Sequence, residues 1–189
     1  MSIELVKQDI LKARTACIVF NVKNYPTQIN DLVKLYGENY QKILYVTLNR
    51  LYNPLKRKIQ QDKIDVSKFT FIDCVTKTAV AQPEEHEDCI YVTAPNALTE
   101  LSIAITKSIQ KNYPDVVLFD SLSTLLIYEN PMIISQFIHS STNKMNAFGV
   151  NIAFTILEGD KEQALIKDMG MFLDKVINIP NTPDQTPPK

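Results

Sequence analysis

The chain has 189 residues, of which 45% are hydrophobic and 22% are charged, as is ordinary for one globular domain with a sizeable core. Its formal net charge of −1 provides no overall field to attract nucleic acid or an anionic membrane. The three cysteines lack C-x-x-C spacing, and no run of residues is apolar enough for a signal peptide or a membrane span. We therefore expect a cytoplasmic protein without a disulfide framework, a zinc site or membrane contact.

The first half of the chain alternates between helical and strand patterns. Apolar residues at helical spacing predict a helix over residues 2–14, and the apolar run at 16–22 predicts a short buried strand. After a loop, Pro26 and Thr27 mark the start of a second helix. The other elements expected in this half are a strand at 42–49, a short helix from Asn53 to Ile59, a strand at 69–75, an acidic loop at 82–88 and a strand at 89–94.

The second half continues this alternation. Asn96 is expected to cap a long helix, and DVVLFD at 115–120 is typical of a strand that is covered on both faces. The later elements are a helix at 131–148 that stops at Gly149, a strand at 150–157, a helix near 161–173 and a strand at 175–179. This order predicts an α/β fold, a three-layer α/β/α sandwich whose central sheet is mostly parallel.

Two segments stand apart from this pattern. The last nine residues, 181–189, contain three prolines and little apolar content, which predicts a disordered tail after a single domain at 1–180. The acidic segment EEHEDC at 84–89 contains residue types that could bind a metal. A solvated loop is the simpler interpretation of this segment.

The loop after the first strand is where a sheet of this kind would hold a phosphate, beyond the carboxyl ends of its strands. This loop, NVKNYPTQIN at 21–30, contains no glycine, and Pro26 removes one backbone donor. A P-loop needs glycines and a lysine, so the sequence excludes a conventional one. Lys23 could offer a charge to a phosphate and Thr27 a hydroxyl to a metal. A solvent-facing lysine and a helix-capping threonine are the simpler interpretations.

Four segments of the chain carry a family resemblance. FIDCV, NALTELSIAITKSIQKNYPDVVLFDSLSTLLIY, FIHSSTNKM and MFLDKVINI together resemble archaeal members of the KaiC-like branch of the RecA ATPase superfamily. The resemblance covers roughly residues 16–179 and implies a RecA-type sheet flanked by helices. It also implies that Asp120 matches the Walker B aspartate that holds magnesium, with Ser121 beside it. The family's catalytic glutamates follow the second strand, where this chain has Asn49 and Arg50.

These departures bear on catalysis. Asparagine and arginine cannot accept a proton from an attacking water at neutral pH, so the chain lacks the general base as well as the phosphate loop. The resemblance therefore implies a degenerate, ATPase-like member. A lone carboxylate binds magnesium weakly without a phosphate, so we expect no metal unless a nucleotide is bound. Asp120 is expected instead to cap the turn after its strand through backbone N–H groups.

The preferred hypothesis is a catalytically inactive RecA-like domain that needs no cofactor and acts as a regulatory or assembly module. Its partner would be itself, an active paralogue or another protein, and the extra apolar residues Met132 and Ile133 favour such association. The alternative is a nucleotide-binding protein or weak ATPase that binds ATP and magnesium through an atypical loop. A DNA-binding module is disfavoured because no basic stripe is present. The candidate, vestigial nucleotide-binding residues are Lys23, Asn24, Thr27, Asn49, Arg50, Asp120 and Ser121.

Overall fold

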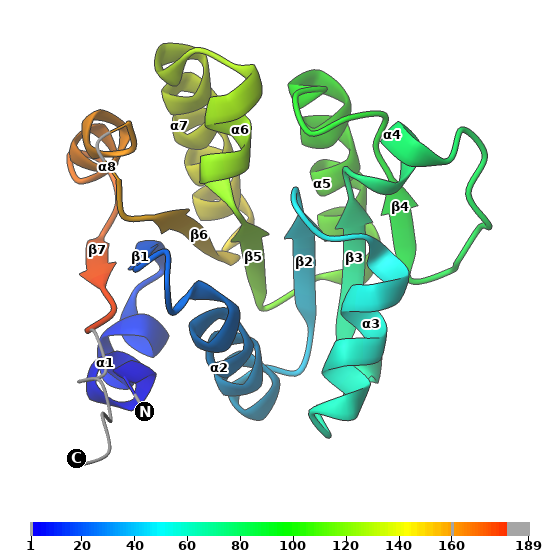
Figure 1. Ribbon diagram of the computed structural model, residues 1–189, viewed down its shortest axis with the longest axis horizontal. Coiled ribbons are helices and arrows are strands. Elements are labelled where there is room, and N and C mark those ends of the chain that lie inside the picture. The colour runs from blue at the N-terminus through cyan, green and yellow to red at the C-terminus, as the bar shows by residue number, and fades with distance from the viewer. Residues whose placement is uncertain (1, 160, 181–189) are drawn as a thin grey trace, which may run out of the picture.

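The computed structural model describes residues 2–159 and 161–180, which contain one seven-stranded sheet (Figure 1). The strand order is β4-β3-β2-β5-β6-β1-β7, and all the pairings are parallel. The strands are β1 (Thr15–Phe20), β2 (Ile43–Thr47), β3 (Phe69–Asp73), β4 (Cys89–Tyr91), β5 (Val116–Asp120), β6 (Asn151–Leu157) and β7 (Lys175–Asn178). The predicted α/β fold with a parallel central sheet is confirmed.

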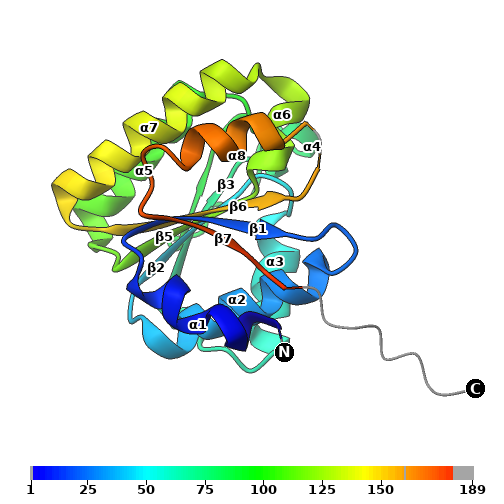
Figure 2. The same cartoon turned by 90° about the vertical axis from the view of Figure 1, so that its left-hand side faces the viewer.

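Helices cover both faces of the sheet, which completes the three layers (Figure 2). One face carries α1 (Ser2–Lys12), α2 (Tyr25–Asn39) and α3 (Tyr52–Gln61). The other face carries α5 (Leu98–Asn112), α6 (Leu122–Tyr128), α7 (Pro131–Phe148) and α8 (Gln163–Met169). A 3₁₀ turn, Val66–Lys68, precedes β3, and the short helix α4 (Thr76–Ala79) follows it. No helix among the described residues combines the length and the apolar character that a bilayer crossing requires.

The alternation of side chains along β5 divides the core into two halves. Val117 and Phe119 pack with the helices α5 to α8, whereas Val116 and Leu118 pack with α1 to α3. All four side chains are at most 1% exposed, which explains why this strand shows no polar alternation. Because side chains alternate strictly along a strand, Asp120 points to the same face as Val116 and Leu118. The last residue of β5 therefore places a carboxylate on the side of α2 and α3.

Several local expectations are corrected by the structure. Asn96 does not cap α5, because the helix begins at Leu98, and the Asn96 side chain instead donates a hydrogen bond to Glu129, 3.4 Å away. Two short helices, α4 and α6, were not expected, since four and seven residues are too few to show a helical period. The helix expected near 161–173 comprises only Gln163–Met169. Gly149 ends α7 in the left-handed conformation, as expected.

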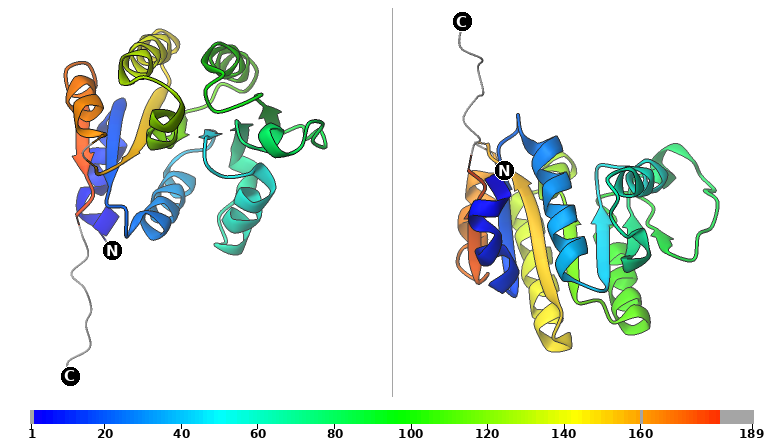
Figure 3. Two further views of the ribbon diagram at one scale, coloured as in Figure 1. Left: turned by 45° about the horizontal axis from the view of Figure 1, so that its top comes forward. Right: turned by 90° about the horizontal axis from the view of Figure 1, so that it is seen from below.

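The segment between α4 and β4 projects beyond the β4 edge of the sheet (Figures 1 and 3). It contains the acidic loop expected at residues 82–88, in which His86 forms an isolated β-bridge with Cys89. The disordered tail predicted at residues 181–189 lies outside the described residues.

Candidate functional site

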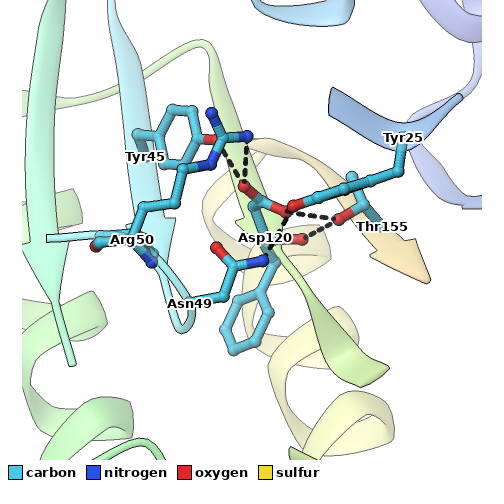
Figure 4. Close-up of polar contacts among 8 residues, drawn as sticks. Tyr25, Tyr45, Asn49, Arg50, Asp120 and Thr155 are labelled. Carbon is cyan, nitrogen blue, oxygen red and sulfur yellow. Dashed lines mark hydrogen bonds and ion pairs between the residues drawn. The ribbon is translucent and has the colours of Figure 1, made fainter. Parts of the chain in front are cut away.

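Asp120 lies at the carboxyl end of β5, and its side chain is completely buried. The described hydrogen bonds to its carboxylate come from four side chains (Figure 4). The Tyr45 hydroxyl and Arg50 Nη2 donate to Oδ2 at 2.6 and 3.1 Å. The Tyr25 hydroxyl donates to Oδ1, and the Thr155 hydroxyl lies 3.2 Å from the same oxygen. We refer to Tyr25, Tyr45, Asn49, Arg50, Asp120 and Thr155 as the Asp120 cluster.

The strand order explains why these side chains meet. β5 lies between β2 and β6, and the registers pair Thr47 with Asp120 and Phe119 with Phe154. Tyr45 is two residues before Thr47 and therefore points to the same face of the sheet as Asp120. Thr155 follows Phe154 and places its hydroxyl beside the carboxylate. The rest of the cluster comes from the loop after β2 and from the first residue of α2.

Burial and charge together set the protonation of these groups. Burial, followed by the charge of Asp120, raises the pKa of Tyr45 well above its ordinary value and raises that of Tyr25 in the same way. Burial acts to lower the pKa of Arg50, but Tyr45, Asp120 and Tyr25 outweigh it, so that this pKa is also raised. At neutral pH the two phenols are therefore donors, and Arg50 is a cation paired with the carboxylate. Its guanidinium also lies 5.9 Å from the centre of the Tyr25 ring.

The expectation that Asp120 caps a turn through backbone N–H groups is wrong for the described contacts, which come from side chains. Asp73, the last residue of β3, has that role instead. Its Oδ1 accepts hydrogen bonds from the backbone N–H groups of Val75 and Thr76 at 2.6 and 2.8 Å. Its Oδ2 accepts one from the Tyr52 N–H at 2.6 Å. The sequence did not distinguish the two aspartates because the donors to Asp120 lie 35 to 95 residues away along the chain.

The structure brings together only some of the candidate nucleotide-binding residues. Asn49 and Arg50 join the cluster, and the Asn49 amide donates to the Tyr25 hydroxyl at 2.8 Å. Lys23 and Thr27 are exposed and lie outside it. Thr27 does not cap α2, because the N-cap residue is Asn24. Ser121 is buried and precedes α6, and its peptide bond with Asp120 is cis.

Three members of the cluster were not foreseen from the sequence. Tyr25 stands beside a proline at the start of a helix, and Tyr45 and Thr155 lie within strands that consist mostly of apolar residues. The available signal is a hydroxyl side chain inside a buried strand, ILYVT or NIAFTIL, on either side of the strand that ends in aspartate. Reading that signal requires the strand order, because only the order makes β2 and β6 neighbours of β5.

A cavity of about 330 Å³ opens beside the cluster. Tyr25 and Arg50 form part of its lining and stand between the cavity and the buried carboxylate. The described residues contain no group of three or more histidine, cysteine, aspartate or glutamate side chains arranged to hold a metal. The full lining is Tyr25, Pro26, Asn30, Asn49, Arg50 and Lys58.

Comparison with known proteins identifies the fold. No protein-family model and no curated protein matches the sequence. Among solved structures, the chain is similar to the KaiC-like protein PH0186 from the hyperthermophilic archaeon Pyrococcus horikoshii, with a TM-score of 0.54 and 14% identity. The match covers 76% of this chain and 61% of that one, so the chain spans less than two thirds of its structural neighbour. The chain thus has a KaiC-like, RecA-type α/β fold.

Proposed function

We propose that this protein is a catalytically inactive RecA-like domain that acts as a regulatory or assembly module through contacts with other proteins. The observation that carries the proposal is the complete burial of Asp120 behind its four side-chain donors. A carboxylate has about four lone-pair positions for hydrogen bonds. Tyr25, Tyr45 and Arg50 occupy three of these positions. The Thr155 hydroxyl lies 3.2 Å from both Oδ1 and the Phe119 carbonyl and blocks access to the fourth. A magnesium ion does not fit this arrangement unless Tyr25 or Arg50 moves away.

The loop between β1 and α2 supports the same conclusion. A phosphate is held by backbone N–H groups that point inward, but the N–H groups here bond within the loop. The N–H of Lys23 donates to Asn21 Oδ1 at 3.0 Å, and the N–H of Asn24 donates to the Asn21 carbonyl at 3.1 Å. The N–H groups of Thr27 and Gln28 donate to the Asn24 carbonyl, and Pro26 has none. These groups offer no cradle to a triphosphate.

The residues at the position expected for the general base also support the proposal of a catalytically inactive domain. Asn49 and Arg50 follow β2, where the family resemblance implies glutamates. The structure engages both side chains, one with the Tyr25 hydroxyl and the other with Asp120. Arg50 stays charged because its pKa is raised, so it cannot take a proton from water. In this conformation neither residue can activate a nucleophile.

An exposed apolar corner supports the interaction role. Ile127 and Tyr128 at the end of α6 are 76% and 54% exposed, and Met132 and Ile133 at the start of α7 are 65% and 42% exposed. Four large apolar side chains within seven residues exceed the scattered exposure usual on a monomer, and such patches mark sites of protein contact. The net charge of −1 opposes association little. The proposed partner is a second copy, an active paralogue or another protein.

The alternative function, nucleotide binding or weak ATPase activity, has one observation in its favour. The cavity beside the Asp120 cluster is lined by two cations, Arg50 and Lys58. Both are already paired, Arg50 with Asp120 at 3.1 Å and Lys58 with Asp62 at 2.6 Å, which weakens their attraction for a phosphate. The alternative therefore requires these pairs to open.

One experiment separates the two functions. The purified protein is heated with and without ATP and magnesium, and released phosphate is measured in parallel. Ligand at a hundred times its dissociation constant stabilises a protein by about 2.7 kcal/mol. We expect neither a rise in melting temperature nor phosphate release. A rise that disappears in Lys58→Ala but persists in the exposed control Lys34→Ala would support the alternative and reject the inactive domain.

A further inference from the structure

A second cavity, of about 600 Å³, lies at the β4 edge of the sheet, and none of its lining residues belongs to the Asp120 cluster. Its lining residues come from α4, from the loop that follows α4 and from the edge strand β4. That loop projects beyond β4 (Figures 1 and 3). An added strand would occupy this space, in the plane of the sheet. The lining residues are Lys77, Ala81, Gln82, Pro83, Glu85, His86, Cys89, Ile90 and Tyr91.

The backbone of β4 presents polar groups to this cavity. The Asp88 carbonyl accepts from the Phe71 N–H at 2.7 Å, and the Val92 N–H donates to the Asp73 carbonyl at 2.9 Å. The backbone N–H and C=O groups of residues 88 and 92 thus point toward β3, and by alternation those of Ile90 do as well. The backbone groups of Cys89 and Tyr91 point away from β3. Of these, the Cys89 N–H donates to the His86 carbonyl at 3.2 Å. The N–H of Tyr91 and the carbonyls of both residues remain directed to the open edge.

Exposed edges of this kind are the usual sites for addition of a peptide strand. Proteins that avoid such addition use lysine, proline or a covering segment at the edge. β4 has no lysine or proline within its sequence, Cys-Ile-Tyr, and the loop covers its edge only at Cys89, through the bridge to His86. Ile90 is also 38% exposed, which gives an added strand an apolar neighbour.

The charge around the cavity indicates the kind of segment that fits. The cavity lining contains one carboxylate, Glu85, and one cation, Lys77, and two further exposed carboxylates, Glu84 and Glu87, lie beside the lining on the same loop. Asp88 adds no net charge because Lys56 pairs with it at 2.8 Å. The excess of carboxylates repels nucleic acid and acidic peptides and attracts basic ones. His86 also places a buried Nε2 at this site without a hydrogen-bond partner among the described residues.

We infer that this cavity binds an extended, basic peptide segment of a partner protein, which pairs with β4 and adds an eighth strand to the sheet. The inference rests on the interaction role proposed above and specifies the partner's chemistry. A strand of three residues is about 10 Å long, which suits a segment of about four residues. The chain's own basic run at 55–58 is helical within α3, so a second copy does not supply this segment in its folded form.

The test uses the full-length protein and synthetic hexapeptides, with binding measured by titration calorimetry. The probe alternates lysine and valine, and we expect saturable binding that weakens as salt is added. A peptide with glutamate in place of lysine should not bind. A lysine peptide with proline at a central valine keeps its charge but loses a backbone donor, and it should bind about tenfold more weakly. Equal binding of the proline peptide would overturn strand addition.

Protein variants and amide exchange locate the site. Glu84→Lys with Glu87→Lys should abolish binding of the lysine peptide, since both residues are exposed and their replacement leaves the core intact. The control Glu4→Lys with Glu38→Lys changes exposed residues on α1 and α2 by the same charge and should bind normally. Hydrogen exchange of the Tyr91 amide should slow when the peptide binds. Binding without this protection, or no binding at all, would refute the inference, whereas the ATP experiment has its own outcome in either case.

Discussion

Two completely buried aspartates end β3 and β5, the two strands on either side of β2, and the chain satisfies their hydrogen bonds in different ways. Asp73 at the end of β3 is held by three backbone N–H groups and the Thr76 hydroxyl. Asp120 at the end of β5 is held by two phenols, a threonine and an arginine. The same position at the carboxyl end of a buried strand thus has two solutions, one based on the local turn and the other on side chains from other elements.

The difference follows from what comes after each strand. After Asp73 the chain turns into α4 within three residues, so the N–H groups of Val75 and Thr76 point back at the carboxylate. After Asp120, helix α6 begins without a side-chain cap from Ser121. The Asp120 carboxylate instead forms an ion pair with Arg50, whereas no described ion pair involves Asp73. Asp120 therefore depends on tertiary contacts, and Asp73 depends mainly on its own turn.

The largest effect is expected from removing the cation of the Asp120 cluster. Arg50→Met leaves a buried carboxylate without its charged partner and should lower the free energy of unfolding by about 3 kcal/mol. Urea denaturation measures the loss. The control is Lys56→Met, because both side chains of the Lys56–Asp88 pair are about a third exposed, and it should cost less than about 1 kcal/mol. Equal losses in the two variants would mean that Arg50 does not compensate a buried charge.

A smaller effect is expected at the other aspartate. Asp73→Asn keeps an acceptor for Val75 and Thr76 but places an amide donor against the Tyr52 N–H, so it should cost about 2 kcal/mol. Asp65→Asn is the matched control, because Asp65 accepts the Ser67 N–H in an exposed turn, and this variant should lose much less stability than Asp73→Asn. Urea unfolding of both variants provides the comparison. A loss no larger in Asp73→Asn than in Asp65→Asn would show that burial adds nothing to this cap.

Alkaline pH should affect the two aspartates differently, because only the Asp120 cluster contains phenol donors. The pKa of Tyr45 is raised above 10.0, so the folded protein holds this proton more tightly than the unfolded chain does. The contribution of this proton to the free energy of unfolding is complete below pH 10.0, and it is lost as the pH rises from 10.0 through the raised pKa of Tyr45. Tyr45→Phe should cost about 1 kcal/mol at neutral pH and make the alkaline loss of stability less steep.

Urea unfolding over a pH series through the ordinary tyrosine pKa of 10.0 measures this slope. Tyr52, whose pKa is raised to about 12 by burial and by its hydrogen bond to Asp88, contributes equally in every variant. Asp65→Asn, which removes a charge remote from the buried tyrosines and cysteines, should therefore keep the wild-type slope, and Tyr45→Phe should not. If both variants retain the same slope, the Tyr45 proton does not link pH to the stability of the Asp120 cluster.

Much of the architecture could be predicted because it depends on local patterns. The apolar run before Asp120 indicates a strand buried on both faces, and all five residues of β5 are buried. The glycine-free loop at 21–30 excludes a conventional P-loop from composition alone. The site was predicted less well. Asn49, Arg50 and Asp120 are in contact or share a partner, whereas Lys23 and Thr27 lie outside, since proximity in sequence does not decide where an exposed side chain points.

The sequence by itself determined the alternation of strands and helices, the absence of glycine from the loop at 21–30 and the position of Asp120 at a strand end. These properties depend on spacing and residue type within a few positions. Only the tertiary structure decided what Asp120 binds, because Tyr45 and Thr155 reach it through the order β2-β5-β6, which periodicity does not contain. The edge cavity likewise depends on β4 ending the sheet and on the path of the loop that precedes this strand. Hydrogen bonds between distant segments depend on which strands become neighbours, and the packing of the whole chain selects those neighbours.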